Sequence, residues 1–187
     1  MNQLLWYVSR ATGLVSLVLL TTVLVLGAVT SGRRAPHGER ATVVMGLHRW
    51  LSLGMVVFLG VHVGTAVAET YVSIDAISAV IPFTSSYSTL WVGLGTLAVD
   101  LIIAVVVTSW LRLRIPERAW RAVHLTSYAL WPIALVHGFA MGTASEPLLR
   151  AVTVACGLVG IGTLAWRANT RHADAARRSD VLTQEWT

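Results

Sequence analysis

The chain has 187 residues, of which 55% are hydrophobic and only 12% are charged, and its mean hydropathy is +0.68. Soluble proteins usually carry about 25% charged residues, so this composition excludes an ordinary water-soluble globule. The basic residues behind the formal net charge of +5 are all arginines, and they form no basic stripe on a soluble domain, so a nucleic-acid partner has no support.

Long uncharged runs predict an all-α bundle of about five transmembrane helices. The hydrocarbon core of a bilayer is about 30 Å thick and needs about 20 residues of helix. In chain order, the runs that reach this length are residues 11–30, 42–68, 90–111, 120–141 and 147–166. The first run lacks the basic leader and the small-residue site of a cleaved signal peptide, so we expect it to stay in the protein. These spans predict a transmembrane domain over residues 1–167 and a short polar tail over 168–187.

The placement of the arginines predicts the orientation of these spans, because cytoplasmic connections are enriched in Lys and Arg. Eleven of the 14 basic residues fall on one side of the predicted topology, at positions 33, 34, 40, 112, 114, 118, 121, 167, 171, 177 and 178. The opposite side holds only Arg10 and Arg150. We therefore predict a multi-pass protein of the plasma (inner) membrane with its N-terminus outside and its C-terminus in the cytoplasm.

The longest connection, residues 69–89, joins the second and third spans on the predicted outer side. It contains Ile74, Ile77, Ile81 and Phe83 at near-helical spacing around Pro82. This pattern is typical of a short amphipathic segment that lies along the membrane surface. We expect it to cap a site in the bundle from outside.

Four of the six histidines fall inside predicted spans: His48 and His62 in the second, and His124 and His137 in the fourth. The other two, at positions 37 and 172, lie in polar segments where a solvated histidine needs no function. An imidazole in lipid is costly unless it has a partner. A single such histidine is more often a hydrogen-bonding brace between helices, but two on each of two spans favour haem ligation.

The spacing of these histidines predicts two levels within the membrane. His48 and His62 are 14 residues apart, so they point within about 40° of each other and are separated by about 21 Å along the helix. His124 and His137 are 13 residues apart, which gives a rise of about 20 Å but a difference in direction of about 140°. Pro132 lies between them, and a proline kink or a local wide turn would restore a common direction.

Because the second and fourth spans run parallel, the spacing predicts that His48 pairs with His124 near the cytoplasmic end and His62 with His137 near the outer end. Two pairs about 20 Å apart do not fit one small metal cluster. They fit two haems stacked across the bilayer, each held by neutral imidazoles from two helices. The chain has no C-x-x-C-H motif, so we expect both haems to be non-covalent.

Glycines and arginines near the histidines are further candidates for the same site. Gly46 and Gly60 each precede a histidine by two positions and either leave room for a porphyrin or only permit close helix packing. Arg49 and Arg121 are candidates for the propionates of the inner haem, and Arg10 for those of the outer one. Snorkelling of these arginines to lipid headgroups is the open alternative.

Asp100 lies near the middle of the third span, at a predicted depth similar to that of Tyr128 and Trp131 in the fourth. A charged and unpaired carboxylate at that depth costs a few kcal/mol, so we expect Asp100 to be protonated or hydrogen-bonded to such a neighbour. A structural clamp is the first interpretation, and a proton relay or quinone contact is the second. Trp131 either fills the gap between two macrocycles or packs as an ordinary core residue.

Three sequence motifs resemble those of the ferric reductase-like transmembrane domain family, which includes the membrane parts of ferric reductases and NADPH oxidases and the haem subunit of the bacterial periplasmic methionine sulfoxide reductase system. They are W-R-A-V-H at 120–124 followed by Tyr128 and His137, G-L-H-R at 46–49 followed by His62, and L-W-Y-V-S-R-A-T-G at 5–13. The resemblance covers about residues 4–167. It implies that the four intramembrane histidines hold b-type haem and that electrons cross the membrane. Larger members carry an additional span and a cytoplasmic flavin and nicotinamide domain, for which this sequence has no counterpart.

The leading hypothesis is a dihaem b-type membrane cytochrome, an oxidoreductase component that carries electrons across the membrane, with its electron donor domain on a separate partner. We expect a flavin or a quinone to act only through that partner or through the bilayer, and we expect an extracytoplasmic acceptor. One alternative is a haem subunit that is fed by quinol and serves an extracytoplasmic reductase. Another is a non-redox membrane protein whose histidines brace helices.

Overall fold

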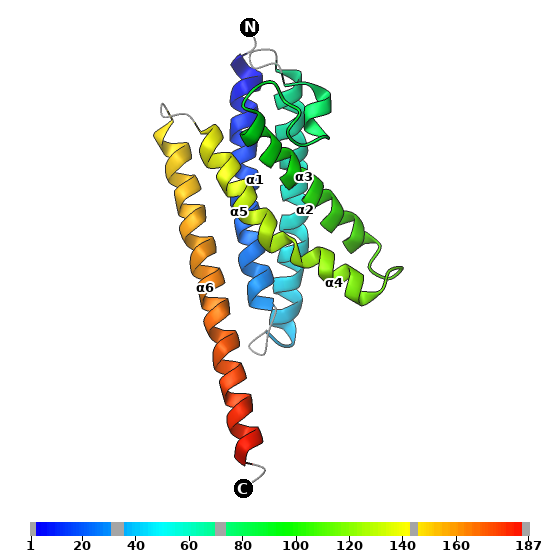
Figure 1. Ribbon diagram of the computed structural model, residues 1–187, viewed down its shortest axis with the longest axis vertical. Coiled ribbons are helices and arrows are strands. Elements are labelled where there is room, and N and C mark those ends of the chain that lie inside the picture. Colours follow the sequence, from blue (N-terminus) through cyan, green and yellow to red (C-terminus); the bar gives the residue numbers. More distant parts are fainter. Residues whose placement is uncertain (1–2, 31–35, 70–73, 143–145, 185–187) are drawn as a thin grey trace.

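The computed structural model describes residues 3–30, 36–69, 74–142 and 146–184, and their side chains for 4–30, 36–69, 74–142 and 146–169. Within these ranges the chain is all-α, as predicted (Figure 1). The elements are α1 (Gln3–Thr30), α2 (Glu39–Ala68), the 3₁₀ helix η1 (Ala76–Ala79), α3 (Thr89–Trp110), α4 (Glu117–Leu125), α5 (Ser127–Met141) and α6 (Pro147–Gln184).

Four helices are long and apolar enough to cross a membrane, with mean hydropathies of 1.8 to 2.4 over their most apolar windows. They comprise Leu4–Thr30, Glu39–Ala68, Thr89–Trp110 and Pro147–Asn169. These lengths and compositions are those of a multi-pass membrane protein. The helices extend beyond several predicted limits because helical hydrogen bonding continues into the polar residues at the ends of the apolar runs.

The fourth predicted span, 120–141, is not one continuous helix, and this corrects the prediction of about five uninterrupted spans. A turn at Thr126 divides it into α4 and α5, and Pro132 lies inside α5. The backbone N–H of Thr126 donates to Val123 O over 3.0 Å, which is a tightened i to i−3 bond. The hydroxyl of Ser127 donates to His124 O over 2.7 Å and satisfies a carbonyl at the break.

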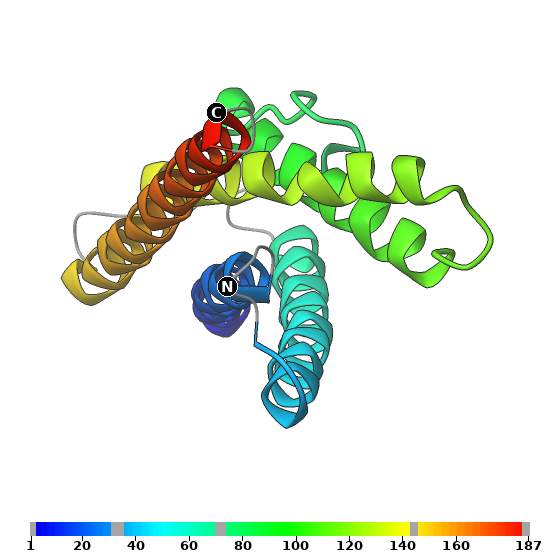
Figure 2. The same cartoon turned by 90° about the horizontal axis from the view of Figure 1, so that it is seen from below.

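The helices lie in two layers. Figure 2 shows α1 and α2 together on one side, while α3, α4, α5 and α6 lie on the other. α1 packs on α2, α5 and α6, and α3 packs on α5. The two segments that carry the four candidate haem ligands, α2 and α4–α5, therefore belong to different layers.

The buried core lies between the layers, midway along the bundle. It consists of Leu20, Leu24, Met55, Ala98, Ile102, Leu130 and Trp131. Trp131 is 3% exposed, and its Nε1 donates to Thr21 Oγ1 over 3.1 Å. Gly160 of α6 lies against the Trp131 ring so closely that an added Cβ would overlap it. Trp131 is thus a packed core residue, as one of the two interpretations held.

The connection at 74–88 folds back over one end of α3. Thr96 Oγ1 donates to Ser78 O over 2.6 Å and ties η1 to α3. Phe83 has a φ of +65°, an uncommon conformation for a residue with a large side chain. Its ring and backbone nitrogen lie where a Cβ on Gly93 would be. The close approach to Gly93 holds Phe83 in this conformation, while Ile77 and Ile81 remain exposed.

α6 is joined to the opposite end of α1. Arg167 Nη1 donates to Ala28 O over 3.0 Å, which satisfies one of the carbonyls that the last turn of α1 leaves without a helical partner. α6 continues to Gln184, so the described part of the predicted polar tail is helical and extends beyond the other helices (Figure 1).

Candidate functional site

The four histidines that the sequence singled out, at positions 48, 62, 124 and 137, approach one another in two pairs between the layers. The His48 ring on α2 and the His124 ring on α4 have centroids 6.4 Å apart and planes at 53°. The His62 ring on α2 and the His137 ring on α5 have centroids 6.3 Å apart and planes at 75°. We call these the inner pair and the outer pair, following the orientation predicted from the arginines.

The separation within each pair matches what two imidazoles need to bind one metal ion from opposite sides. An imidazole nitrogen lies about 1.1 Å from its ring centroid and binds a transition metal at about 2 Å, which places the centroids of two trans ligands about 6 Å apart. Among the described residues, no group of three or more His, Cys, Asp or Glu is placed to hold a metal ion. Two imidazoles alone suit a metal whose other coordination positions are filled by a macrocycle, as in haem.

Both rings of the outer pair are oriented by backbone carbonyls. His62 Nδ1 donates to Ser9 O over 2.7 Å, and His137 Nδ1 donates to Trp91 O over 2.7 Å. A carbonyl oxygen only accepts, so the proton of each neutral ring is on Nδ1. The lone pair is then on Nε2, and a ligating histidine typically donates its other ring N–H in this way.

Glycines on neighbouring helices make room for three of the four rings. A Cβ on Gly13 would lie 2.8 Å from His62 Nδ1, and one on Gly95 would lie 2.6 Å from a carbon of His137. A Cβ on Gly27 would lie 3.4 Å from a carbon of His48. Sequence reasoning did not assign these glycines to the histidine rings that they face, because their proximity to histidines far along the chain leaves no local pattern.

The two glycines that were selected, Gly46 and Gly60, have different surroundings. A Cβ added at either position would meet no described protein atom within 4 Å. Among the described residues, contact with a neighbouring helix therefore does not account for either glycine. Clearance for a porphyrin stays a prediction for both positions.

A cavity of about 520 Å³ surrounds the outer pair. Its volume falls in the range of about 300–1,000 Å³ that is usual for ligand and cofactor sites. Most of its wall is apolar and comes from α1, α2, α3 and α5, and its charged residues are Arg10, Glu69 and Arg150. Residues of the 74–88 connection, among them Ile74, Ser78 and Tyr87, also line it. The described part of the connection thus forms part of the cavity wall, as the expected cap would.

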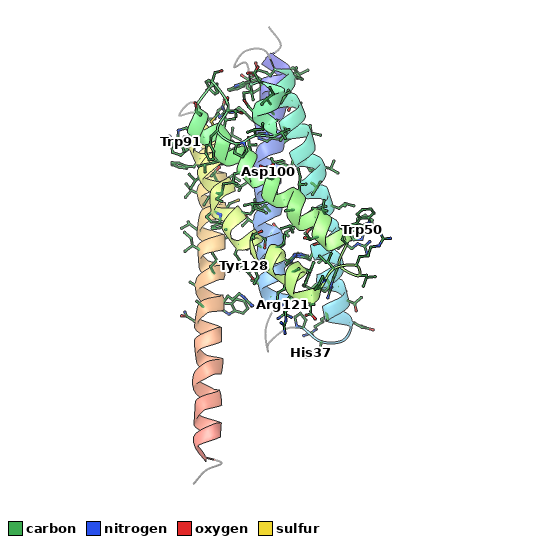
Figure 3. The ribbon with its side chains drawn as sticks, turned by 45° about the vertical axis from the view of Figure 1, so that its right-hand side comes forward. His37, Trp50, Trp91, Asp100, Arg121 and Tyr128 are labelled. Carbon is green, nitrogen blue, oxygen red and sulfur yellow. The ribbon has the colours of Figure 1, made fainter. Side chains whose placement is uncertain are left out.

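The three arginines predicted to bind haem propionates lie in different surroundings. Arg10 lines the outer cavity, with its guanidinium 4.5 Å from the centroid of the Trp6 ring. Arg121 forms an exposed ion pair with Glu117 over 2.8 Å, and Arg49 is exposed. Figure 3 shows Arg121 at the end of the bundle opposite Trp91. Arg150 was missed as a lining residue, although it is one of only two arginines on the predicted outer side.

The surroundings of the inner pair differ from those of the outer pair. Nδ1 of His48 and Nδ1 of His124 are buried and make no hydrogen bond of good geometry with the described residues. The Trp120 ring stacks on the His124 ring, with centroids 4.9 Å apart and planes at 23°. Arg112 in turn lies over the Trp120 ring at 4.4 Å. Sequence reasoning missed this stack, although the i, i+4 spacing of Trp120 and His124 on a helix was a signal for it.

Asp100 does not make the hydrogen bond expected with Trp131, because Trp131 donates to Thr21 instead. The described part of the chain gives the half-buried Asp100 neither an ion pair nor a hydrogen bond. Figure 3 shows Tyr128 further toward the Arg121 end than Asp100. His37 is exposed, and the side chain of His172 lies outside the described residues.

The sequence matches a family described as "Ferric reductase like transmembrane component" over residues 12–135, about two thirds of the chain. The matched range contains His48, His62 and His124, and it ends just before His137. No curated protein and no solved structure matches the chain.

Proposed function

The chain belongs to the ferric reductase-like transmembrane component family, and from this premise we propose that it is a dihaem b-type membrane cytochrome that transfers single electrons across the membrane. The observation that carries the proposal is the pair of histidine sites, each with ring centroids 6.3–6.4 Å apart. His48 and His124 would hold the inner haem, and His62 and His137 the outer one. A bound haem supplies an iron centre that accepts and releases one electron at a time.

The protein contributes orientation and insulation. The carbonyls of Ser9 and Trp91 fix the tautomers of the outer histidines and direct each Nε2 away from the supporting backbone. The apolar core around Trp131 lies between the two levels and excludes water from the path between them. Arg10 and Arg150 supply positive charge to the outer cavity, which suits the carboxylates of a porphyrin.

The arginine distribution supports electron flow from the cytoplasmic side to the outside of the plasma (inner) membrane. Arg112 and Arg114 lie in the turn between α3 and α4, Arg118 lies in the first turn of α4, which also carries His124, and all three are exposed. Such a positive surface favours docking of a separate acidic flavoprotein as donor. The acceptor is then an extracytoplasmic molecule or protein.

A second candidate is a quinol-fed subunit that serves an extracytoplasmic reductase. A specific observation favours it: an apolar groove of about 540 Å³ between α5 and α6 is lined in part by Trp91, whose carbonyl holds His137. Buried Thr153 lines both this groove and the outer cavity. The groove provides an apolar surface for a lipid-soluble donor beside the outer level.

Haem content tests the proposal. The purified protein should contain two non-covalent haems per chain, measured as the pyridine haemochrome. His62→Ala and His124→Ala should each remove one haem, and a different one, because the two histidines belong to different pairs. The exposed His37 provides a matched control, since His37→Ala should retain both haems.

Two results would overturn this assignment. A protein that carries no haem after purification from haem-supplemented cells favours histidines that only brace helices. Loss of the same spectral component in both variants refutes the pairing. Reduction by a quinol analogue, compared with reduction by a nicotinamide-driven soluble flavoprotein, then separates the two candidate donors.

A further inference from the structure

Arg112, Trp120 and His124 form a continuous stack beside the inner pair. Trp120 and His124 are one turn apart on α4, so their rings lie on the same face of the helix. The rings are nearly parallel, and the Arg112 guanidinium lies 4.4 Å from the centroid of the indole. Arg112 itself directly follows Leu111, the C-cap residue of α3. The stack thus joins the end of α3 to a candidate haem ligand on α4.

Within the described part of the chain, no hydrogen bond from the Trp120 or His124 ring holds this stack in place. Nδ1 of His124 and Nε1 of Trp120 are both buried, and neither has a hydrogen-bond partner among the described residues. The outer histidines, in contrast, are each fixed by a 2.7 Å bond to a carbonyl. The orientation of the His124 ring therefore depends on its contact with the indole, and the indole in turn is covered by Arg112.

Two features of this stack both favour the reduced state of a metal bound to His124. A hydrogen bond from Nδ1–H to a carbonyl makes an imidazole a stronger donor and stabilises the oxidised metal, and no described residue accepts such a bond from His124. A nearby cation disfavours the oxidised state, because that state carries one more positive charge. Arg112 is held close to His124 through the indole.

We propose that Trp120 is a positioning residue for His124, and that the Arg112–Trp120 stack raises the midpoint potential of the inner haem. This inference rests on the proposed function. It concerns the contribution of the stack to the inner site and leaves the potential of the outer haem unaffected, because the outer pair has its own backbone partners.

The test is a spectroelectrochemical titration of the haem-loaded protein, together with its low-spin EPR signal, which depends on the angle between the two imidazole planes. Trp120→Leu removes the aromatic contact, and Trp120→Phe retains it without the unpaired N–H. Arg112→Gln removes the charge. Arg114→Gln is the matched control, since it removes an exposed charge two positions away that is not part of the stack.

We expect Trp120→Leu to lower the reduction equilibrium constant of the inner haem about threefold to tenfold, about 30–60 mV for one electron, and to broaden its EPR signal. Trp120→Phe should leave the EPR signal as narrow as in the wild-type protein, because it retains the aromatic contact. Arg112→Gln should lower the inner potential more than Arg114→Gln does, and it should have little further effect in the Trp120→Leu background. Selective loss of the inner haem in Trp120→Leu also supports positioning, and Arg112→Gln then tests the potential.

The proposal is overturned if Trp120→Leu leaves both the inner potential and the EPR signal unchanged. It is also overturned if Arg112→Gln and Arg114→Gln shift the inner potential equally, because the effect is then one of general surface charge. If Trp120→Leu fails to fold, Trp120→Phe and Arg112→Gln still decide between these outcomes. A wild-type protein without two haems refutes the proposed function instead, so the two failures are distinct.

Discussion

Replacement of Gly95 by alanine should displace His137 and remove the outer haem. The added Cβ would lie 2.6 Å and 2.8 Å from two atoms of the His137 ring. Ordinary contacts between such atoms are about 3.5–4.0 Å, so the ring has to move by about 1 Å. That movement lengthens the bond from His137 Nδ1 to Trp91 O from 2.7 Å to beyond hydrogen-bonding range. A metal–ligand bond tolerates a change of only about 0.2 Å.

The assay for Gly95→Ala is the haemochrome ratio together with the reduced-minus-oxidised spectrum of the purified protein. We expect the ratio to fall from two haems to one, with the inner component unchanged. Gly54→Ala is the matched control, because its Cβ would meet only Leu19 at 3.9 Å, an ordinary contact. Gly60→Ala is the informative comparison: it meets no described protein atom within 4 Å, so a loss of haem there reports contact with the porphyrin itself.

The prediction fails if Gly95→Ala retains two haems and an unchanged outer spectrum. His137 would then not be confined between Gly95 and the Trp91 carbonyl. Gly13→Ala provides an independent check from the other side of the same site, since its Cβ would lie 2.8 Å from His62 Nδ1. Both variants should remove the same spectral component, and removal of different components would refute the outer pair.

Three further predictions concern other parts of the molecule. Charge reversal at Arg114 and Arg118 should slow the reduction of the protein by a cytoplasmic flavoprotein, more so at low salt, and should leave its reduction by quinol unchanged. The measurement is the stopped-flow reduction rate, and a rate that does not depend on these charges would favour quinol as donor. Thr96→Val leaves the buried carbonyl of Ser78 without its 2.6 Å hydrogen bond, so the free energy of unfolding in detergent should fall by about 1–3 kcal/mol. The local effect is measured as faster proteolysis of the 74–88 connection. Gly160→Ala should displace Trp131 and lower the thermal stability, whereas Gly162→Ala, which meets no described atom within 4 Å, should not.

The features that depend on local geometry could be predicted from the residues alone. Hydropathy identified the membrane segments because the length of an apolar helix and the thickness of a bilayer are matched. The 14-residue interval between His48 and His62 placed both on one side of α2 because the helical period is fixed by backbone hydrogen bonds. The 13-residue interval between His124 and His137 does not place both side chains on one side of an ideal helix. The sequence predicted that a kink or a wide turn would correct this, but it did not predict where the irregularity lies.

The rotation of the helices against one another could not be predicted in this way, and this rotation determines which residues each side chain contacts. The helix break lies at Thr126, six positions before Pro132. It depends on the hydroxyls of Thr126 and Ser127, which donate to carbonyls at the end of α4. Ser9 and Trp91 hold the outer histidines through backbone carbonyls, 53 and 46 residues away along the chain. Every residue has such a carbonyl, so no residue type marks it in advance. Gly13 and Gly95 likewise matter because each faces a histidine ring on another helix. Which ring a glycine faces is set by the packing between helices and cannot be predicted from local periodicity.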